Sequence, residues 1–292
     1  MSRETLGLLL GFLAVCMFAG TLPLTHLAVE GLSPYFVTAG RAAVAGLLAG
    51  TTLVLLRRRP PARRQIATFV LIAGCLVVGF PGFTALAMQE VPASHGGVVL
   101  GILPLTTSLM SALLAGERPG AAFWLAAAAG GALVVGFTLV EGGGALGVGD
   151  IYLLAAVAVT ALGYVLSAKL VQTGMAGWEV ISWVLVVALP LSLPVAIWLF
   201  PSAPLAVPAW SWIGFAYVTV ISQYLGFFAW NAGLALGGIA LVSQVQLLQT
   251  FITLVLAWWL NGESVSWTAW IVAAAVLGLV IAAKHASAAK PG

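Results

Sequence analysis

Apolar residues in this chain form long runs that short polar segments interrupt, and the runs recur along its whole length. A helix needs about 20 apolar residues to cross the hydrocarbon core of a bilayer, which is about 30 Å thick. By that measure the pattern predicts ten membrane-spanning segments, at residues 6–28, 34–56, 66–88, 93–115, 120–140, 150–172, 178–200, 210–233, 239–261 and 266–284. The runs lack the alternation of a transmembrane β-barrel, so we expect an all-α integral membrane protein.

One long segment of the chain occurs twice. Residues 103–135 align with residues 249–281 after a shift of 146, which is half of the 292-residue chain. In both copies an apolar run is followed by a Gly-Glu pair and a second apolar run, so that Glu117 aligns with Glu263. This spacing indicates a duplication.

The duplication predicts two units of five spans each, at residues 1–141 and 150–292, joined by a Gly-rich linker at 142–149. Because five is odd, the second unit must enter the membrane in the opposite orientation to the first. Inverted repeats of this kind are typical of secondary transporters, whose substrate site lies near the bilayer midplane between the repeats.

Composition agrees with this fold class. Hydrophobic residues make up 62% and charged residues 7% of the chain, with a mean hydropathy of +1.13, whereas soluble domains carry about 25% charged residues. The net charge of +3 does not indicate nucleic-acid binding, because the cations lie in short loops between the apolar runs.

Basic residues fall almost entirely on one side of the predicted topology, and cytoplasmic loops are the ones enriched in Lys and Arg. We therefore expect both termini in the cytoplasm. The eleventh cation, Arg41, lies inside the second span, near enough to the outer surface to reach the headgroups. The other ten fall in cytoplasmic segments: Arg3, Arg57, Arg58, Arg59, Arg63, Arg64, Arg118, Lys169, Lys284 and Lys290.

The repeated Gly-Glu pair and its flanking runs resemble the ten-helix EamA branch of the drug/metabolite transporter superfamily. In that family a proline commonly stands twelve residues before the pair, as Pro104 does here, whereas the second unit has Thr250. Residues 30–34 (EGLSP) and 229–231 (AWN) resemble the YddG-type exporters of aromatic amino acids. At the position of a tryptophan in that type, the sixth span here has Ala161.

The resemblance implies that spans one, three, four, six, eight and nine surround a central path, while the fifth and tenth lie at the periphery. Polar groups that face lipid are costly, so those within spans should face protein or water. The candidate substrate-binding residues are Phe18, Thr21, Phe80, Phe83, Ser94, Val98, Gly101, Tyr164, Tyr224, Trp230, Asn231, Gln244 and Gln246.

The ninth span is the most polar for its depth. Ser243, Gln246, Thr250 and Thr253 follow helical spacing on one face, and they could either bind substrate or hydrogen-bond to other helices. For Asn231 a bond to another helix is favoured.

Proline interrupts the backbone bonding of a helix, and we expect hinges at Pro23, Pro81 and Pro104. Pro190 and Pro194 are further candidates for bends. The two repeats would rock about the central cavity as these helices bend.

These observations together predict an exporter of small amphipathic metabolites, amino acids foremost, with aromatic ones favoured by the resemblance. We expect an uncharged cavity that suits a neutral or zwitterionic substrate. All eight carboxylates fall in loops or at span ends, so the prediction is facilitated diffusion or weak coupling to ions. His26 and His95, near outer helix ends, are interpreted as satisfied interfacial histidines.

Two other functions stay open. Multidrug efflux of flat cations would require a buried carboxylate or an aromatic cage, and a membrane sensor or assembly subunit would require no path at all. Motifs of phosphate loops, zinc proteases and serine hydrolases are absent from the sequence, so an enzyme is not expected.

No cofactor or metal is expected either. Cys16 and Cys75 lie inside apolar runs and are interpreted as buried free thiols. The expected partners are the small-molecule substrate and the lipid bilayer, with no nucleic acid. We expect a monomer, because each half supplies the other's inverted partner.

Overall fold

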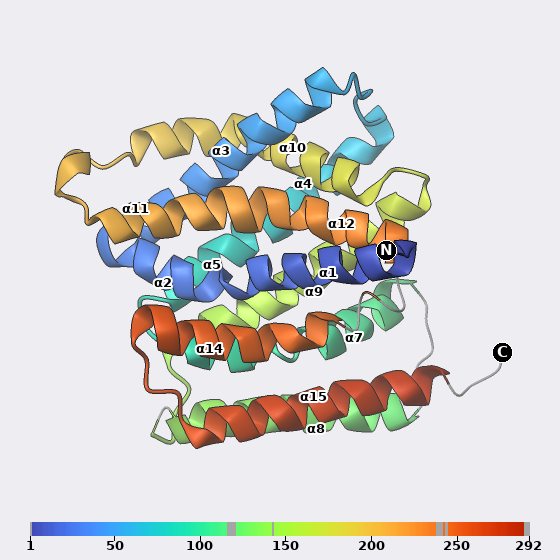
Figure 1. The fold of residues 1–292 in the computed structure, drawn as a ribbon, viewed down its shortest axis with the longest axis vertical. Helices are drawn as coiled ribbons and strands as arrows, with labels where there is room; N and C mark the ends of the chain where they lie inside the picture. The colour runs from blue at the N-terminus through green and yellow to red at the C-terminus, as the bar shows by residue number, and fades with distance from the viewer. Residues whose placement is uncertain (1, 116–120, 142, 238–241, 243–244, 289–292) are drawn as a thin grey trace.

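The computed structural model describes residues 2–115, 121–141, 143–237, 242 and 245–288 of the chain. All regular elements in these residues are helical, and no strand occurs among them. Figure 1 shows the helices lying side by side along one common direction, as a bundle that spans a bilayer requires. The all-α fold class expected from the hydrophobic pattern is therefore present.

Eight helical stretches are long and apolar enough to cross a membrane, and they coincide within a few residues with the first eight predicted spans. Two shorter apolar helical stretches, Val245–Asn261 and Trp267–Ala282, fall where the ninth and tenth spans are predicted. The eight are Arg3–Gly31, Pro34–Leu55, Arg63–Ala87, Ala93–Leu114, Trp124–Glu141, Val148–Gln172, Gly177–Trp198 and Ala209–Gly237.

Five of the stretches are single unbroken helices. They consist mostly of apolar and small residues with few charges, so they can pack closely on one another and on lipid. These helices are α3 (Pro34–Leu55), α8 (Ala121–Glu141), α9 (Val148–Gln172), α10 (Gly177–Trp198) and α15 (Trp267–Ala288).

The other stretches change their helical geometry part-way. The first consists of α1 (Arg3–Ala19) and α2 (Thr21–Gly31), and the fourth of α6 (Ala93–Leu100) and α7 (Leu103–Ala115). The third runs through η1 (Arg63–Gln65), α4 (Ile66–Ile72), η2 (Ala73–Gly79) and α5 (Phe80–Ala87). After the short η3 (Pro204–Ala206), the eighth comprises α11 (Ala209–Ala216), η4 (Tyr217–Leu225) and α12 (Gly226–Gly237), and the ninth comprises η5 (Val245–Leu248) and α14 (Gln249–Asn261).

The segments η2 and η4 are both π-helices, and the 146-residue shift places one on the other. Likewise, the turn at Gly101 and Ile102 between α6 and α7 corresponds to the 3₁₀ segment η5. π-helical turns are rare and occur often at functional sites. The two halves therefore depart from regular α-helix at equivalent places.

Helices of one half pack mainly against helices of the other. In Figure 1, α3 crosses α10 and packs on it, α1 lies along α12, and α8 lies along α15. The third stretch, through η2 and α5, packs in turn on α9. Under the 146-residue shift the pair of α1 with α12 corresponds to the pair of α9 with α5.

The close approach of α1 and α12 depends on glycine. A Cβ added at Gly7 would lie 2.3 Å from the backbone nitrogen of Gly237, and one added at Gly233 would lie 2.8 Å from that of Gly11. Small residues spaced four apart on both helices bring the two backbones into contact, as is common between membrane helices.

The Gly-Glu pair of the second unit has a structural role. Gly262 ends α14 in the left-handed conformation, with φ of 66°, which glycine adopts without strain. The next residue, Glu263, accepts hydrogen bonds at 2.8 Å from the backbone N–H groups of Ala93 and Ser94 at the start of α6. The carboxylate thereby satisfies the open N-terminus of a helix in the other half. Glu117, in the first unit, lies outside the described residues.

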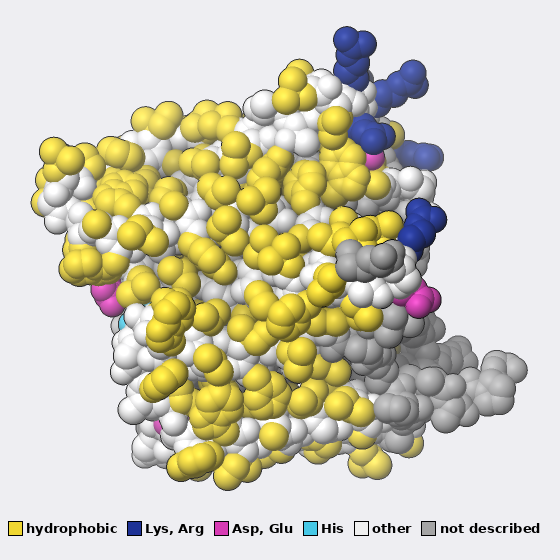
Figure 2. Space-filling view, viewed as in Figure 1, with side chains coloured by type: hydrophobic (Ala, Val, Ile, Leu, Met, Phe, Trp, Pro, Cys, Tyr) yellow, Lys and Arg dark blue, Asp and Glu magenta, His cyan; other side chains and the backbone are white. Residues whose placement is uncertain are grey.

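The surface along the helices is largely apolar, as Figure 2 shows. Large hydrophobic side chains are exposed on nearly every span, and Trp198 and Trp267, at helix ends, are 82% and 83% exposed. In this view the visible Lys and Arg side chains gather at one end of the bundle. An apolar belt with aromatic residues near its edges suits a lipid environment.

Candidate functional site

A cavity of about 110 Å³ lies inside the bundle. Side chains from both halves line it, from the first four predicted spans and from the sixth, eighth, ninth and tenth. The expectation that the tenth span lies only at the periphery is wrong in one respect. Although α15 lies in the outer layer of Figure 1, its Ala273, Val276 and Val280 form part of the cavity wall.

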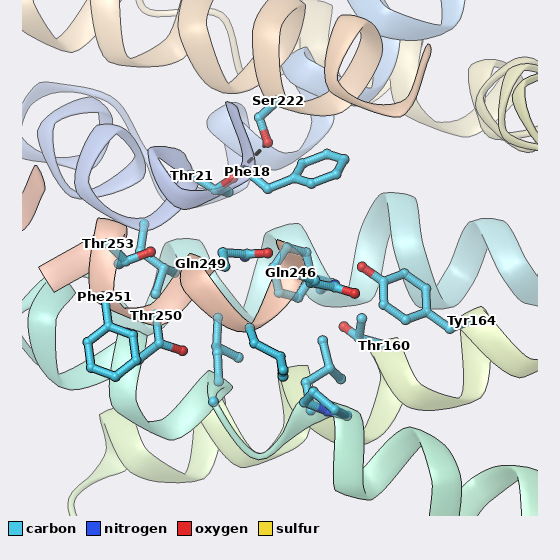
Figure 3. A pocket seen from close by; sticks show the side chains of 18 of the residues that line it. Phe18, Thr21, Thr160, Tyr164, Ser222, Gln246, Gln249, Thr250, Phe251 and Thr253 are labelled. Carbon is cyan, nitrogen blue, oxygen red and sulfur yellow. Dashed lines mark hydrogen bonds between the residues drawn. The ribbon is translucent and has the colours of Figure 1, made fainter. Parts of the chain in front are cut away.

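One side of the cavity is polar and uncharged. Gln246, Gln249, Thr250 and Thr253 follow one another along η5 and the start of α14 (Figure 3). Thr253 donates through Oγ1 to the carbonyl of Ala19 at 2.9 Å. Thr253, the fourth and last residue of the stripe predicted for the ninth span, therefore links two helices, whereas the side chains of Gln246 and Gln249 form no hydrogen bond within the described part of the chain.

Across from this stripe lie hydroxyl groups of α9 and a hydrogen bond between the halves. Gln246 extends toward Tyr164, and Thr160 stands one turn before it on α9 (Figure 3). Thr21 and Ser222 join α2 to η4 through a buried hydrogen bond of 2.7 Å between their hydroxyl oxygens. These groups offer donors and acceptors to a bound molecule.

Aromatic rings complete the wall. Phe18 meets Phe227 edge to face, with ring centroids 5.0 Å apart, and Phe80, Tyr164 and Phe251 also line the space. Such rings provide apolar contact area with little rotational freedom to lose. The cavity is thus amphipathic.

The expectation that Arg41 reaches the outer headgroups is wrong. Its side chain is 1% exposed, lines the cavity, and donates through Nη2 to Oε1 of Gln223 at 2.6 Å. The position of Arg41 along the second span did not predict the direction of its side chain. α3 packs against both α10 and η4, and the guanidinium points inward to the amide of Gln223 in η4. The expectation of an uncharged cavity is wrong for the same reason.

Six of the thirteen candidate substrate-binding residues lie on the cavity wall: Phe18, Thr21, Phe80, Gly101, Tyr164 and Gln246. Gln244 lies outside the described residues.

The other six lie away from the cavity. Phe83 stacks on Tyr152 with ring centroids 6.4 Å apart, and the Tyr224 hydroxyl is bonded to that of Thr52. Asn231 donates to the carbonyl of Phe227 at 2.7 Å, within its own helix and not to another one as favoured. Ser94, Val98 and Trp230 are also absent from the wall: Ser94 lies at the start of α6, Val98 is in the core, and Trp230 is half-buried on α12.

The three predicted hinge prolines each stand just after a place where a helix is interrupted or, at Pro81, changes from π-helix to α-helix. Pro23 is the third residue of α2, Pro81 the second of α5 and Pro104 the second of α7. Proline is tolerated in a first helical turn because its missing N–H would be unpaired there anyway. Pro104 also lines the cavity, whereas Pro190 and Pro194 lie inside the unbroken α10.

His95 is paired, as an interfacial histidine was expected to be. Its Nε2 lies 2.6 Å from Oδ1 of Asp150, and its ring is 5.0 Å from that of Phe137. Asp150 is only 3% exposed. This carboxylate at a span end is therefore inside the protein, which its place in the sequence did not indicate.

The chain matches known transporters over most of its length. The model of the EamA-like transporter family matches residues 5–139 and again residues 147–283. A Bacillus subtilis (strain 168) protein described as "Uncharacterized transporter YdeK" is 44% identical over 285 residues, which are 98% of this chain and 99% of that protein.

This protein belongs to the EamA-like transporter family. It is accordingly a multi-pass membrane transporter, as the resemblance of its Gly-Glu repeats implied. A solved crystal structure with a TM-score of 0.63 covers 98% of the chain and 100% of its own, at 20% identity. At that identity the likeness concerns the fold alone.

Several wall residues of this EamA-like protein were not among the candidates. Gln223 and Thr160 are polar residues within spans, and their depth alone could have marked them. Thr250 was predicted only as part of the polar stripe of the ninth span, beside which Gln249 lies. Arg41 had the clearest signal, since it lies well inside a predicted span, whereas Lys169 and Lys284 lie at the ends of theirs.

Proposed function

We propose that this EamA-like transporter exports small amphipathic metabolites, amino acids foremost, and aromatic amino acids in particular. The observation that carries the proposal is the cavity between the halves, with aromatic rings on one part of its wall and amides and hydroxyls on another. An amphipathic solute needs both kinds of surface, because its polar groups lose water on entry and must find hydrogen-bond partners.

The proposed architecture is ten transmembrane helices in two inverted repeats, residues 1–141 and 150–292, with the linker at 142–149. Two observations support it: helices of one half pack mainly on helices of the other, and the π-helices η2 and η4 occupy equivalent positions in the two halves. The gathering of basic side chains at one end of Figure 2 favours cytoplasmic termini, by the positive-inside rule. We place the protein in the bacterial inner membrane and propose that it acts as a monomer.

Transport would proceed by alternating access, in which the repeats rock about the cavity. The contacts that must change lie between halves, such as the bond of Thr21 with Ser222. Helix breaks beside Pro23, Pro81 and Pro104 are where bending would be absorbed. No Asp or Glu is among the described residues that line the cavity, which favours facilitated diffusion.

The decisive experiment is uptake of labelled amino acids and of one flat aromatic dication into proteoliposomes containing the full chain, with and without a pH gradient. We expect saturable flux of aromatic amino acids that stops at equal concentrations on both sides. Uphill transport driven by the pH gradient would contradict facilitated diffusion. Flux confined to the dication would instead establish multidrug efflux. That alternative is disfavoured because no described residue of the cavity wall is a carboxylate.

A further inference from the structure

The cavity wall carries a cation whose charge no described group balances. Arg41 is 1% exposed, and its single hydrogen bond goes to the neutral amide oxygen of Gln223. Its Nε and Nη1 atoms are buried without a hydrogen-bond partner. Among the described residues the only ion pair joins His95 to Asp150, so no described carboxylate pairs with Arg41.

A buried, unpaired guanidinium is costly in a membrane protein, and intramembrane charges usually mark a substrate path. Purely structural arginines in such places pair with a carboxylate or several carbonyls, whereas Arg41 keeps donors open beside a cavity. A buried donor without a partner carries a desolvation penalty, and an acceptor supplied by a bound solute would remove it.

The chemistry of the guanidinium selects the ligand group. Its planar set of N–H donors matches the two oxygens of a carboxylate, with charge-assisted bonds stronger than neutral ones. A phosphate ester carries more charge and would call for several cations, but Arg41 is the only Lys or Arg among the described wall residues. A single carboxylate therefore balances the site.

We propose that Arg41 binds the carboxylate of the transported solute and that Gln223 positions its guanidinium. This inference deepens the proposed function, on which it rests, by naming the group that the cavity recognises. The rings of Phe18 and Phe227 would contact the apolar part of the solute. The amide oxygens of Gln246 and Gln249 can accept from an ammonium group. Amines, amides and cations that lack a carboxylate leave Arg41 unpaired and should be rejected.

The test is competition with labelled L-phenylalanine for uptake into proteoliposomes by the wild-type protein and by Arg41→Gln. The competitors are 3-phenylpropanoate, which keeps the carboxylate, and L-phenylalaninamide and phenethylamine, which lack it. For the wild type we expect 3-phenylpropanoate to compete well and the other two poorly. Arg41→Gln should raise the KM for phenylalanine about ten- to hundredfold and abolish the preference for the acid over the amide. Arg57→Gln, at an exposed arginine after α3, is the matched control and should keep wild-type values.

A second variant keeps the test decisive if Arg41→Gln does not fold. Gln223→Glu places a carboxylate beside the Arg41 guanidinium, so that the protein itself supplies the missing counter-charge. We expect it to unfold at or above the wild-type temperature and to raise the KM for phenylalanine, because the built-in carboxylate competes with that of the substrate. An unchanged KM in a well-folded Gln223→Glu protein would overturn the inference, as would a wild-type preference for acid over amide in Arg41→Gln.

The outcomes separate this inference from the proposed function. Transport of 3-phenylpropanoate without transport of any amino acid would refute amino-acid export and support the carboxylate site. Transport of phenylalanine that Arg41→Gln leaves unchanged would support export and refute the site. If no solute is transported, thermal stabilisation of the purified protein by 3-phenylpropanoate decides: its loss in Arg41→Gln supports the site, and its absence in the wild type refutes it.

Discussion

At the scale of single residues, two charged side chains have roles that their neighbours in sequence do not reveal. Glu263 follows a turn at the end of α14, yet its carboxylate holds the first two N–H groups of α6, more than 160 residues away in the chain. Arg41 forms no ion pair with a described carboxylate and donates instead to an amide of the opposite half. Each links the two halves through one side chain.

Glu263→Gln should destabilise the protein by about 1–3 kcal/mol. A glutamine offers one acceptor oxygen where the carboxylate offers two, and its NH₂ group would face a backbone N–H. Thermal unfolding of the purified protein measures the loss. Glu90→Gln, at an exposed position in the turn before α6, is the control and should change stability by less than about 0.5 kcal/mol. Equal unfolding temperatures for the two variants would contradict the role assigned to Glu263.

At the scale of helices, small residues decide which spans meet. The glycines of α1 and α12 remove the side chains that would keep the two backbones apart, so van der Waals contact can form along the pair. Glycines elsewhere, such as Gly131 of α8, have nothing within 4 Å of an added Cβ. The same residue type thus has opposite consequences in different helices.

Gly7→Ala should destabilise the protein by about 1–3 kcal/mol, because the added methyl overlaps the backbone of Gly237 and forces α1 and α12 apart. Gly131→Ala should instead be neutral or stabilising, by up to about 1 kcal/mol, since alanine favours the helix and meets no obstacle. Denaturant or thermal unfolding of both variants gives the signs. A stabilising Gly7→Ala would show that the two helices are not held at this distance.

At the scale of the whole molecule, the cavity exists because both halves contribute to one wall. Its polar stripe comes from η5 and α14, its aromatic rings from α1, α5, α9, α12 and α14, and its cation from α3. A membrane sensor or assembly subunit does not require a cavity in its interior. Access of water to the wall is therefore a test of the transport function as a whole.

Gln246→Cys should react with a water-soluble thiol reagent, whereas Val98→Cys should not. Gln246 lines the cavity, while Val98 is fully buried away from it. Both variants require replacement of Cys16 and Cys75 by alanine, because both native cysteines are free. Labelling is measured in membranes by mass spectrometry. If neither cysteine were labelled, the interior would be closed to water, which would favour a function other than transport.

The sequence predicted much of this fold and part of the site. Apolar runs of span length follow directly from the cost of exposing polar groups to lipid, so the spans could be located to within a few residues. Candidates on η5 and α9, such as Gln246 and Tyr164, were found because polar side chains in the middle of a span avoid contact with lipid. Tyr224 and Asn231 are equally polar and deep, but the first bonds to Thr52 and the second to its own helix. Depth alone cannot distinguish these uses.

By itself, the sequence determined the all-helical membrane class, the repeat of 146 residues and the family, since hydrophobic run length and motif spacing are local properties. Only the tertiary structure decided which polar side chains meet across the halves. It turned Arg41 inward to Gln223 and buried Asp150 against His95. The reason is physical: the direction of a side chain depends on which helices surround its own, and those neighbours come from distant parts of the chain.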